Sequence, residues 1–570
     1  MCCNCCSVRQ QKIWVFSIGT ILTVLGAILI PMWPTWSEDI IKSILPLSPG
    51  SVIYNKWVVT PLPIYMSFYM YNWTNPEEVN NTRIKPNFKE VGPYTFKNVK
   101  VKEDLKWNNE DHTVTFFSTN TWTFVPEKSS GGLDDVIRMP HFPTAAAARI
   151  TRKWHKIIRK VVNFGLQREG GAMTMTHTAL EWLFDGFIDN LLDFVYRLHS
   201  PLFPLVSNRF GWFYDRNNSK EAEGSYTIYT GKGNLKDMGE SKMWNGSDHT
   251  KFWEGECGRV NGSLGDLWAP GKSWDDPTSI FLYDAGRFLN IFPIRNETYR
   301  GIDVRRYEAT NRTLDNGQIV EDTKCFCVKR NECPENGVLD FSPKAFRAPV
   351  YMSHPHFYMA SERYRENITG LEPVPEHATY VVLEPKWGIP MKVKGQMMAS
   401  ILYEKDNQME ILKDLGHNFY APLLRISLDA EINDEMLDLV KLLLNVPSIG
   451  VYIGAAFLTI GVVMLVVGIY ITKTHKWRGD SYPGESTESP AIETDNKETQ
   501  SGDTENTNET PPGSENIQTL TRVTEISEES SSPAETVRED PPEETPKTEK
   551  DTTVDTISEK DKTNESKKTD

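Results

Sequence analysis

The sequence lacks the short motifs that mark many enzymes. Gly231 and Gly233 form a G-x-G pair, but Lys236 stands where a dinucleotide-binding loop needs its third glycine. The stretch NGSLG (261–265) does not have the G-x-S-x-G order of a nucleophile elbow. Between 34 and 446 there is no H-E-x-x-H motif and no Cys/His cluster with zinc spacing. We therefore expect no catalytic residue, no metal, no cofactor and no enzyme activity.

Cysteine is scarce, with eight in 570 residues, and its distribution is uneven. Four cysteines lie at the extreme N-terminus: Cys2, Cys3, Cys5 and Cys6. Four lie far along the chain: Cys257, Cys325, Cys327 and Cys333. An even number in an oxidising compartment predicts two disulfides, although four cysteines allow three pairings. His354 and His356, in SHPHF, are expected to be buried or hydrogen-bonded rather than metal ligands.

Two long stretches contain no charged residue. The first runs from Ile13 to Trp33 and the second from Val446 to Thr472. Each reaches the roughly 20 residues that a helix needs to cross a bilayer. The first stretch continues into PMWPTW rather than a small-residue cleavage site. We therefore favour an uncleaved membrane anchor over the alternative, a cleaved signal peptide.

Basic residues beside these stretches predict their orientation: Arg9, Lys12, Lys473, Lys476 and Arg478. The positive-inside rule places both termini in the cytoplasm. The expected organisation is a cytoplasmic N-terminus (1–12), a membrane helix (13–33), an extracellular or luminal domain (34–446), a second membrane helix (447–472) and a cytoplasmic tail (473–570). The resulting two-pass protein is expected at the plasma membrane, or also at endosomal or lysosomal membranes.

Modification signals differ between the two sides. The expected external domain carries eight N-x-S/T sequons, more than chance would give: Asn72, Asn80, Asn217, Asn245, Asn261, Asn296, Asn311 and Asn367. This excess predicts glycosylation. Cytosolic thiols stay reduced, so we interpret the four N-terminal cysteines as palmitoylation sites rather than disulfides or a zinc site. Cys2 follows Met1, which excludes the N-terminal glycine that myristoylation requires.

Most of the negative charge lies in the tail. Residues 479–570 contain 25 Asp or Glu against 9 Lys or Arg, a net charge of −16 in a chain whose total is −15. The only aromatic residue in this segment is Tyr482. Such a composition cannot bury enough apolar surface to fold, which predicts disorder. We find no acidic di-leucine or Tyr-x-x-apolar sorting signal in it.

The segment RITRKWHKIIRKVV (149–162) has the opposite character. It contains no acid and six cationic residues: Arg149, Arg152, Lys153, Lys156, Arg159 and Lys160. On one continuous helix these face away from an apolar stripe, which would be either the packed underside or the border of a lipid entry: Ile150, Trp154, Ile157, Ile158 and Val161. Because the segment lies outside the cytosol in the expected topology, calmodulin and nucleic acid are not expected partners.

Two interpretations of this basic segment remain open. It is either a solvated helix face or a binding site for anionic ligands. We favour the binding site, because no acid within the segment offsets the repulsion among its like charges.

The expected external domain mixes predicted strands, as at 112–124 and 225–231, with helices over 143–200. Seven phrases then occur in a characteristic order: KPNFKEVGPYTF, LEWLFDGFIDN, FGWFYDRNNS, MWNGS, CFC, SHPHF and EPKWGIP. With a helix at each end, this order resembles the class B scavenger receptor family, which includes fatty-acid translocase, the high-density-lipoprotein receptor, the lysosomal integral membrane protein and sensory-neuron membrane proteins. The likeness covers roughly residues 7–475.

The resemblance implies an α+β fold with one large ectodomain, an antiparallel barrel-like β core and a helical cap far from the membrane. It also implies the pairs Cys257–Cys325 and Cys327–Cys333. The family's third disulfide is absent, because its two cysteine positions match Gly286 and Lys344 here.

For function, the resemblance implies a receptor that binds and takes up or transfers lipids, lipoproteins or polyanionic ligands. The basic segment would lie in the ligand-binding cap, and an apolar tunnel would lead to the bilayer. The alternative is a lysosomal sorting receptor that carries a protein cargo on the cap. We disfavour an ion channel, because the second apolar stretch has few polar residues. Homo-oligomerisation stays open.

Overall fold

The computed structural model describes residues 7–478, except for 61, 200–204, 206, 328–332 and 346. These described residues belong to one compact unit. The predicted palmitoylation sites, Cys2, Cys3, Cys5 and Cys6, lie outside the described residues, as does the acidic tail from 479 onward.

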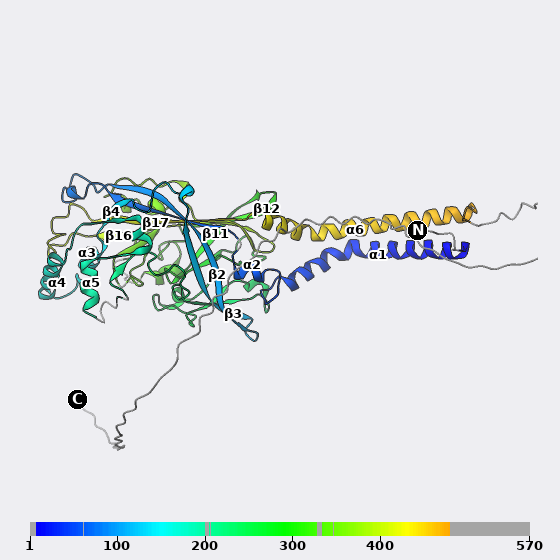
Figure 1. Ribbon diagram of the computed structural model, residues 1–570, viewed down its shortest axis with the longest axis horizontal. Coiled ribbons are helices and arrows are strands. Elements are labelled where there is room, and N and C mark those ends of the chain that lie inside the picture. Colours follow the sequence, from blue (N-terminus) through cyan, green and yellow to red (C-terminus); the bar gives the residue numbers. More distant parts are fainter. Residues whose placement is uncertain are drawn as a thin grey trace, which may run out of the picture. The chain divides into compact units, whose positions relative to one another are not determined.

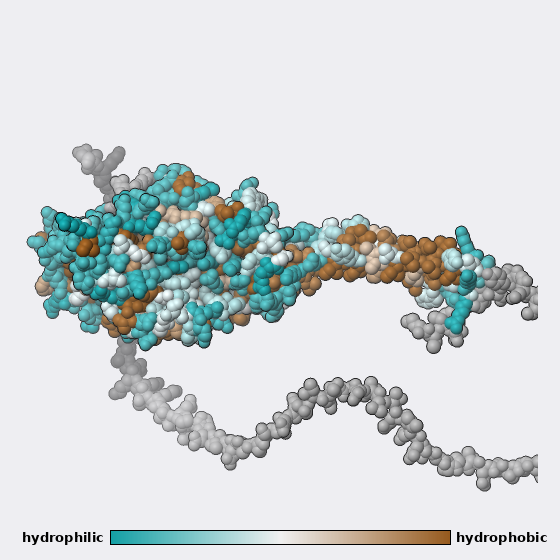
Figure 2. All heavy atoms as spheres, turned by 90° about the horizontal axis from the view of Figure 1, so that it is seen from above, coloured by the Kyte–Doolittle hydropathy of each residue, from teal (hydrophilic) through white to brown (hydrophobic). Residues whose placement is uncertain are grey.

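Two long helices lie at the two ends of the described chain, α1 (Val8–Ile44) and α6 (Asp434–Lys473). Both are long and apolar enough to cross a membrane, and they run side by side (Figure 1). Figure 2 shows hydrophobic surface concentrated over this pair, whereas the domain surface is mostly hydrophilic. Both helices are longer than the uncharged stretches, because each continues out of the apolar stretch into the domain.

Small residues set how closely α1 and α6 pack. A Cβ atom added at Gly26 would lie 2.5 Å from the backbone nitrogen of Leu458, so only glycine permits this approach. Nearer the domain, the Trp33 indole N–H donates to the carbonyl oxygen of Val446 at 2.9 Å. That carbonyl directly precedes Pro447, which lies inside α6. The two helices are therefore joined by both close packing and a hydrogen bond.

Between these helices lies one antiparallel sheet of 13 strands, in the order β10-β11-β12-β15-β16-β17-β1-β2-β3-β8-β9, with β13 and β14 attached through β16. The strands of this sheet are β1 (Ile64–Trp73), β2 (Phe88–Asn108), β3 (Thr113–Phe124), β8 (Ser225–Tyr229), β9 (Ser241–Trp244), β10 (Thr278–Leu282), β11 (Arg287–Tyr299), β12 (Ile302–Glu308), β13 (Val338–Asp340), β14 (Val350–Ser353), β15 (Tyr380–Glu384), β16 (Ile389–Tyr403) and β17 (Phe419–Glu431). The predicted strands at 112–124 and 225–231 are confirmed as β3 and β8.

The sheet is nearly closed at Ser263. This residue forms an antiparallel bridge with Glu240, which directly precedes β9, and a parallel bridge with Ile280 of β10. The two ends of the strand order are thereby linked through one residue. The expected antiparallel, barrel-like core is confirmed.

The helices away from α1 and α6 are short. They are α3 (Phe142–Thr151), α4 (Lys156–Arg168) and α5 (Asn190–Arg197), and they gather at the opposite end of the sheet (Figure 1). Another short helix, α2 (Tyr54–Val58), follows α1. The expectation of only helices over 143–200 is wrong in part. Two small pairs of strands lie in or beside this region: β4 (Val136–Pro140) with β5 (Thr174–Thr178), and β6 (Phe187–Ile188) with β7 (Arg209–Phe210).

The largest hydrophobic core joins the sheet to the helical end. Fully buried aromatic residues from its strands, such as Phe68, Trp73 and Tyr94, are joined by Trp182 from the segment between β5 and β6. The Tyr403 and Phe419 rings stack in parallel at 5.3 Å. Burial of such large side chains, each stabilising by roughly 1.5–3 kcal/mol, fixes the helical end on the barrel.

Candidate ligand-binding cap and apolar pocket

The helices α3 and α4, together with the turn between them, contain the basic segment 149–162, and we call this part the cap. The prediction of one continuous helix is wrong, because α3 ends at Thr151 and α4 begins at Lys156. His155 has extended backbone angles, and its ring accepts a hydrogen bond from the Ile157 N–H at 3.4 Å. This side chain satisfies an N–H at the start of α4 and so caps a new helix.

Acids distant in sequence compensate half of the basic residues in the cap. Glu404, which directly follows β16, lies 2.8 Å from Arg149 and 2.7 Å from Arg152. Asp406 pairs with Arg159, whose side chain is buried. The break between the helices lets Arg149 and Arg159 both face the connection between β16 and β17. The argument that these charges repel without compensation is therefore wrong for these three arginines.

The apolar face of α4 is also opposite to the expected one. Ile157 and Val161 are 67% and 65% exposed, and Ile158 and Phe164 are exposed as well. The packed side instead holds Arg159 and Leu166. The ion pair between Arg159 and Asp406 fixes this rotation, because a buried guanidinium needs its acid. The prediction that Ile157, Ile158 and Val161 form a packed underside is therefore wrong.

Exposed lysines flank this apolar face. Lys153, Lys156 and Lys160 are exposed, and within the described part of the chain no ion pair is seen for Lys156 or Lys160. Exposed apolar side chains bordered by lysines are typical of surfaces that contact lipid or an amphipathic partner. The binding role of Arg149, Arg152, Lys153, Lys156, Arg159 and Lys160 stays a prediction. Of these six residues, the three lysines and Arg152 are exposed, and only the lysines are exposed without an ion pair to Glu404 or Asp406.

No sequon lies between Asn80 and Asn217, a stretch that contains α3, α4 and α5. Among the sequons, the exposed asparagines are Asn80, Asn217, Asn245, Asn296 and Asn311. The half-buried ones are Asn72, Asn261 and Asn367. Glycosylation of all eight stays a prediction, and the cap would carry none of these glycans.

The other end of the domain contains an apolar pocket of about 250 Å³, where α1 and α6 meet the barrel. Its lining comes from both helices and from the sheet; it includes Ile41, Trp57, Trp387, Met391, Ala430 and Val440. Ile44, Val52 and Leu439 also line it, and they are exposed, so they mark its mouth. The pocket can therefore hold an apolar chain next to the membrane helices.

One side of this pocket is polar. Lys102, from β2, lies 2.8 Å from Asp266 and donates to the Thr60 hydroxyl at 3.2 Å. Two residues earlier in β2, Lys100 lies 3.5 Å from Glu223, and Glu223 accepts a hydrogen bond from Asn120. Burial raises the pKa of Asp266, but the charges of Lys102 and Lys100 lower it below its usual value. This carboxylate is therefore ionised.

Sequence reasoning did not find these pocket residues. The alternation of Asn98, Lys100 and Lys102 along β2 indicates one polar face of a strand. It does not show that this face points into the barrel. Trp387 lies in EPKWGIP, one of the phrases that carry the family resemblance. That phrase does not indicate that Trp387 lines a pocket.

Both disulfides implied by the resemblance are present, Cys257–Cys325 and Cys327–Cys333. The two positions that match the family's third disulfide, Gly286 and Lys344, make non-covalent contacts instead. A Cβ at Gly286 would lie 2.5 Å from the Phe252 ring. Lys344 donates to the Tyr283 carbonyl and lies 5.2 Å from the centre of the Trp244 ring. Burial lowers the pKa of Lys344 to about 8. A packed lysine thus joins these loops without a covalent bond.

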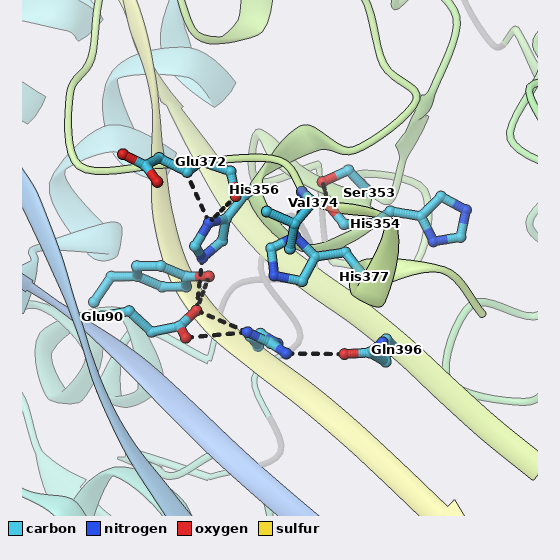
Figure 3. A network of polar contacts seen from close by, with 10 residues as sticks. Glu90, Ser353, His354, His356, Glu372, Val374, His377 and Gln396 are labelled. Atoms are coloured by element: carbon cyan, nitrogen blue, oxygen red, sulfur yellow. Dashed lines mark hydrogen bonds and ion pairs between the residues drawn. The ribbon is translucent and has the colours of Figure 1, made fainter.

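A polar network lies around Glu90 (Figure 3). Glu90 accepts hydrogen bonds from His356 at 2.7 Å, Tyr71 at 2.8 Å and Arg425 at 3.0 Å. Burial alone would raise the pKa of Glu90, but the His356 hydrogen bond and the Arg425 charge lower it to about 2. The expectation for SHPHF is confirmed, because His356 is hydrogen-bonded and His354 is buried.

Two histidines of this region are held neutral. Burial lowers the pKa of His354 to about 4. Burial, together with the charges of Arg425 and His356, also lowers the pKa of His377 to about 4. This region therefore contains one ionised carboxylate, Glu90, and two histidines that resist protonation.

Two apolar helices at the two ends of the described chain, a nearly closed β domain and an apolar pocket at their junction define a β domain with two candidate membrane anchors. A sequence model described as the CD36 family matches residues 17–472, and the chain belongs to that family.

Related proteins agree with this assignment. The chain is 35% identical to Protein peste of Drosophila melanogaster, over 63% of this chain and 64% of that protein. It is 27% identical to Scavenger receptor class B member 1 of Bos taurus, over 79% and 87%. It is 26% identical to Lysosome membrane protein 2 of Mus musculus, over 80% and 94%.

Proposed function

We propose that this protein is a two-pass receptor that docks lipid-carrying or anionic ligands on its cap and passes lipid to the bilayer through the apolar pocket. One observation carries the proposal: residues of α1, α6 and the barrel line the same pocket. A lipid there would be next to the membrane without leaving the protein. The receptor names of class B relatives support the same assignment.

The physical benefit of such a pocket is large. Exposure of one methylene group to water costs about 0.8 kcal/mol, so a long acyl chain or a sterol needs an apolar path. A lined conduit lowers this barrier without any chemical step. In this proposal the pocket is the part of the path nearest the membrane. A tunnel would connect the cap to the pocket.

The cap supports the docking step through its exposed surface. Ile157, Val161 and Phe164 offer apolar contacts, and Lys156 and Lys160 offer positive charge beside them. No sequon lies in this stretch, so none of the predicted glycans would be attached to the docking surface itself. Docking on a lipoprotein or an oxidised lipid surface would use both kinds of contact.

The proposed topology places both termini in the cytoplasm and the domain outside the cytosol, at the plasma membrane or in endosomal and lysosomal membranes. Apolar helices at both ends and the disulfides agree with this arrangement. Palmitoylation of Cys2, Cys3, Cys5 and Cys6 and disorder of the tail belong to the same proposal. Protease protection of tagged termini in sealed vesicles tests the orientation.

The test of docking compares cells that express matched surface amounts of two double variants. Lys156→Gln with Lys160→Gln changes the cap, and Lys89→Gln with Lys251→Gln changes two exposed lysines elsewhere. Binding and uptake of a fluorescent fatty acid, a sterol and a lipoprotein are measured. We expect the cap variant alone to lose binding of the particle. Equal binding by both variants would refute the docking step.

The alternative is a lysosomal sorting receptor that carries a protein cargo on its cap. One relative of the chain is named Lysosome membrane protein 2, and this name supports a lysosomal location. It predicts that the chain resides in lysosomes and that the cap variant releases a soluble protein while lipid uptake stays unchanged. The same cell lines distinguish the two functions.

A further inference from the structure

The ends of α1 and α6 that lie farthest from the domain carry five cations from two distant parts of the sequence. We call these residues the basic collar: Arg9, Lys12, Lys473, Lys476 and Arg478. Lys12 is half-buried and the other four are exposed. Figure 2 shows a hydrophilic end beyond the hydrophobic surface of the helix pair. The basic collar therefore lies where the apolar part of both helices stops.

Hydrogen bonds hold these two helix ends together. The side-chain amide of Gln11 donates to the carbonyl oxygen of Arg478 at 3.1 Å, across 467 residues of sequence. His475 has a φ of 51°, in the left-handed region, so the chain changes direction shortly after α6. Trp477 is buried, and its indole N–H donates to the Thr472 hydroxyl at 3.1 Å. The end of the described chain thus turns back to α1, which brings cations from both termini into one place.

The part of the chain that the structure describes contains no acid that compensates the basic collar. The first acidic residue of the sequence is Glu38, and Asp438 is the last one before the end of α6, so both lie beyond the apolar stretches. No ion pair is seen among the described residues for any of the five cations. The arginines of the cap differ, because Glu404 and Asp406 compensate them. Such a group of like charges attracts anions.

We propose that the basic collar binds a phosphoinositide, a lipid whose head group carries several phosphate groups, in the cytoplasmic leaflet of the membrane. Arginine can hold a phosphate with two parallel hydrogen bonds, and lysine acts as a point charge. A head group with several phosphates can contact cations of both helices at once, whereas a lipid with a single charge cannot. This inference rests on the topology in the proposed function, which places both termini in the cytoplasm.

The acidic tail is another anionic partner within reach, because Asp480 follows the basic collar by two residues. The net charge of the tail, −16, is spread over residues 479–570, with nine basic residues among the acids. A phosphoinositide instead concentrates its phosphates on one ring, at the membrane surface where the basic collar lies. The density of charge therefore favours the lipid, and removal of the tail tests the alternative.

The experiment measures binding of a fluorescent, short-chain phosphatidylinositol bisphosphate to the full chain in phosphatidylcholine nanodiscs. Both sides of a nanodisc are accessible, so the result does not depend on the orientation of the protein in cells. Short-chain phosphatidylserine and inorganic phosphate serve as competitors beside the unlabelled phosphoinositide. We expect the phosphoinositide to displace the probe at a concentration about tenfold lower than either competitor.

Two double variants test whether both helix ends contribute to the site. Arg9→Gln with Lys12→Gln changes α1, and Lys473→Gln with Lys476→Gln changes the end of α6. Each variant removes two charges near the head group, so we expect each to weaken binding roughly thirtyfold. If a variant does not fold, the competition measured on the wild type still decides.

The matched control removes two charges elsewhere. Lys89→Gln with Lys251→Gln changes two exposed lysines of the domain and should bind the probe like the wild type. A chain truncated after Arg478 lacks the acidic tail and should bind the probe at least as tightly as the full chain.

The outcomes separate this inference from the proposed function. Loss of binding in only one collar variant would overturn a site built from both helix ends. Equal displacement by phosphatidylserine, or no binding by the wild type, would overturn the phosphoinositide site. Binding that appears only after truncation would assign the basic collar to the acidic tail instead. None of these results affects lipid transfer through the pocket, and protease protection tests the topology separately.

Discussion

The two ends of the domain differ in where their charged and apolar side chains lie. At the cap, arginines turn inward to Glu404 and Asp406, and the apolar side chains of α4 face outward. At the membrane end, the apolar side chains line a pocket and ion pairs lie on its walls. The proposed function uses this difference, because it needs an exposed docking surface at the cap and an enclosed apolar path at the membrane end.

The buried ion pair at the cap gives the largest expected effect. Asp406→Ala leaves the Arg159 guanidinium buried without its acid, so we expect a loss of roughly 3–5 kcal/mol in the free energy of unfolding. Asp414→Ala, an exposed change in the same connection, should have little effect. Thermal unfolding of the full chain in detergent measures both. Similar unfolding temperatures for the two variants would contradict the account of how α4 is oriented.

The membrane end can be disturbed through the contact between α1 and α6. Gly26→Leu places side-chain atoms against the backbone of Leu458, and such overpacking costs about 1–3 kcal/mol. Gly165→Leu is the control, because a Cβ at Gly165 meets nothing within 4 Å. We expect Gly26→Leu alone to lower the yield of folded protein. A normal yield for it would show that this close approach is not needed.

His354 is a buried base with no acid beside it among the described residues, so its contribution to the free energy of unfolding should depend on pH, unlike that of the ion pairs at the two ends of the domain. His354 is neutral when folded, with a pKa of about 4, whereas an unfolded histidine titrates near 6.5. Between these values the unfolded chain binds more protons, so stability falls as the pH drops from about 6.5 toward 4. We expect a loss of roughly 1–2 kcal/mol from pH 7 to 5.

His354→Phe should remove part of this acid sensitivity, and His249→Gln, a change at an exposed histidine, should not. Unfolding temperatures at the two pH values give the comparison. An identical pH dependence for wild type and His354→Phe would rule out His354 as its source.

The exposed lysines of the cap give the smallest expected effect on stability. Lys156→Gln with Lys160→Gln should change the free energy of unfolding by no more than about 0.5 kcal/mol, because exposed side chains seldom contribute more. Their effect should appear in ligand binding instead. A large loss of stability would mean that these lysines support the fold rather than a docking surface.

Much of the fold could be predicted from local sequence. Uncharged stretches located α1 and α6, and alternation located β3 and β8. The ordered phrases predicted the barrel-like core and the disulfide pairs. These features depend on short spacings or on a shared family pattern, so one sequence contains them.

The cap could not be predicted in the same way. The acids that compensate its arginines are Glu404 and Asp406, about 250 residues away along the chain. Helical periodicity treats Arg159 as exposed, because it cannot include a distant partner. The same limit hid the pair between Lys102 and Asp266. Long-range ion pairs decide which face of an element is inside, and a local pattern does not contain them.

The most direct test of the central claim fills the pocket. Ala430→Trp places a large side chain among the lining residues, and Ala222→Trp makes the same change at an exposed position. Transfer of a fluorescent sterol from bound lipoprotein into the cell membrane is measured at matched surface expression. We predict that Ala430→Trp still binds the particle but transfers little lipid, while Ala222→Trp transfers normally. Normal transfer by Ala430→Trp would contradict a lipid path through the pocket.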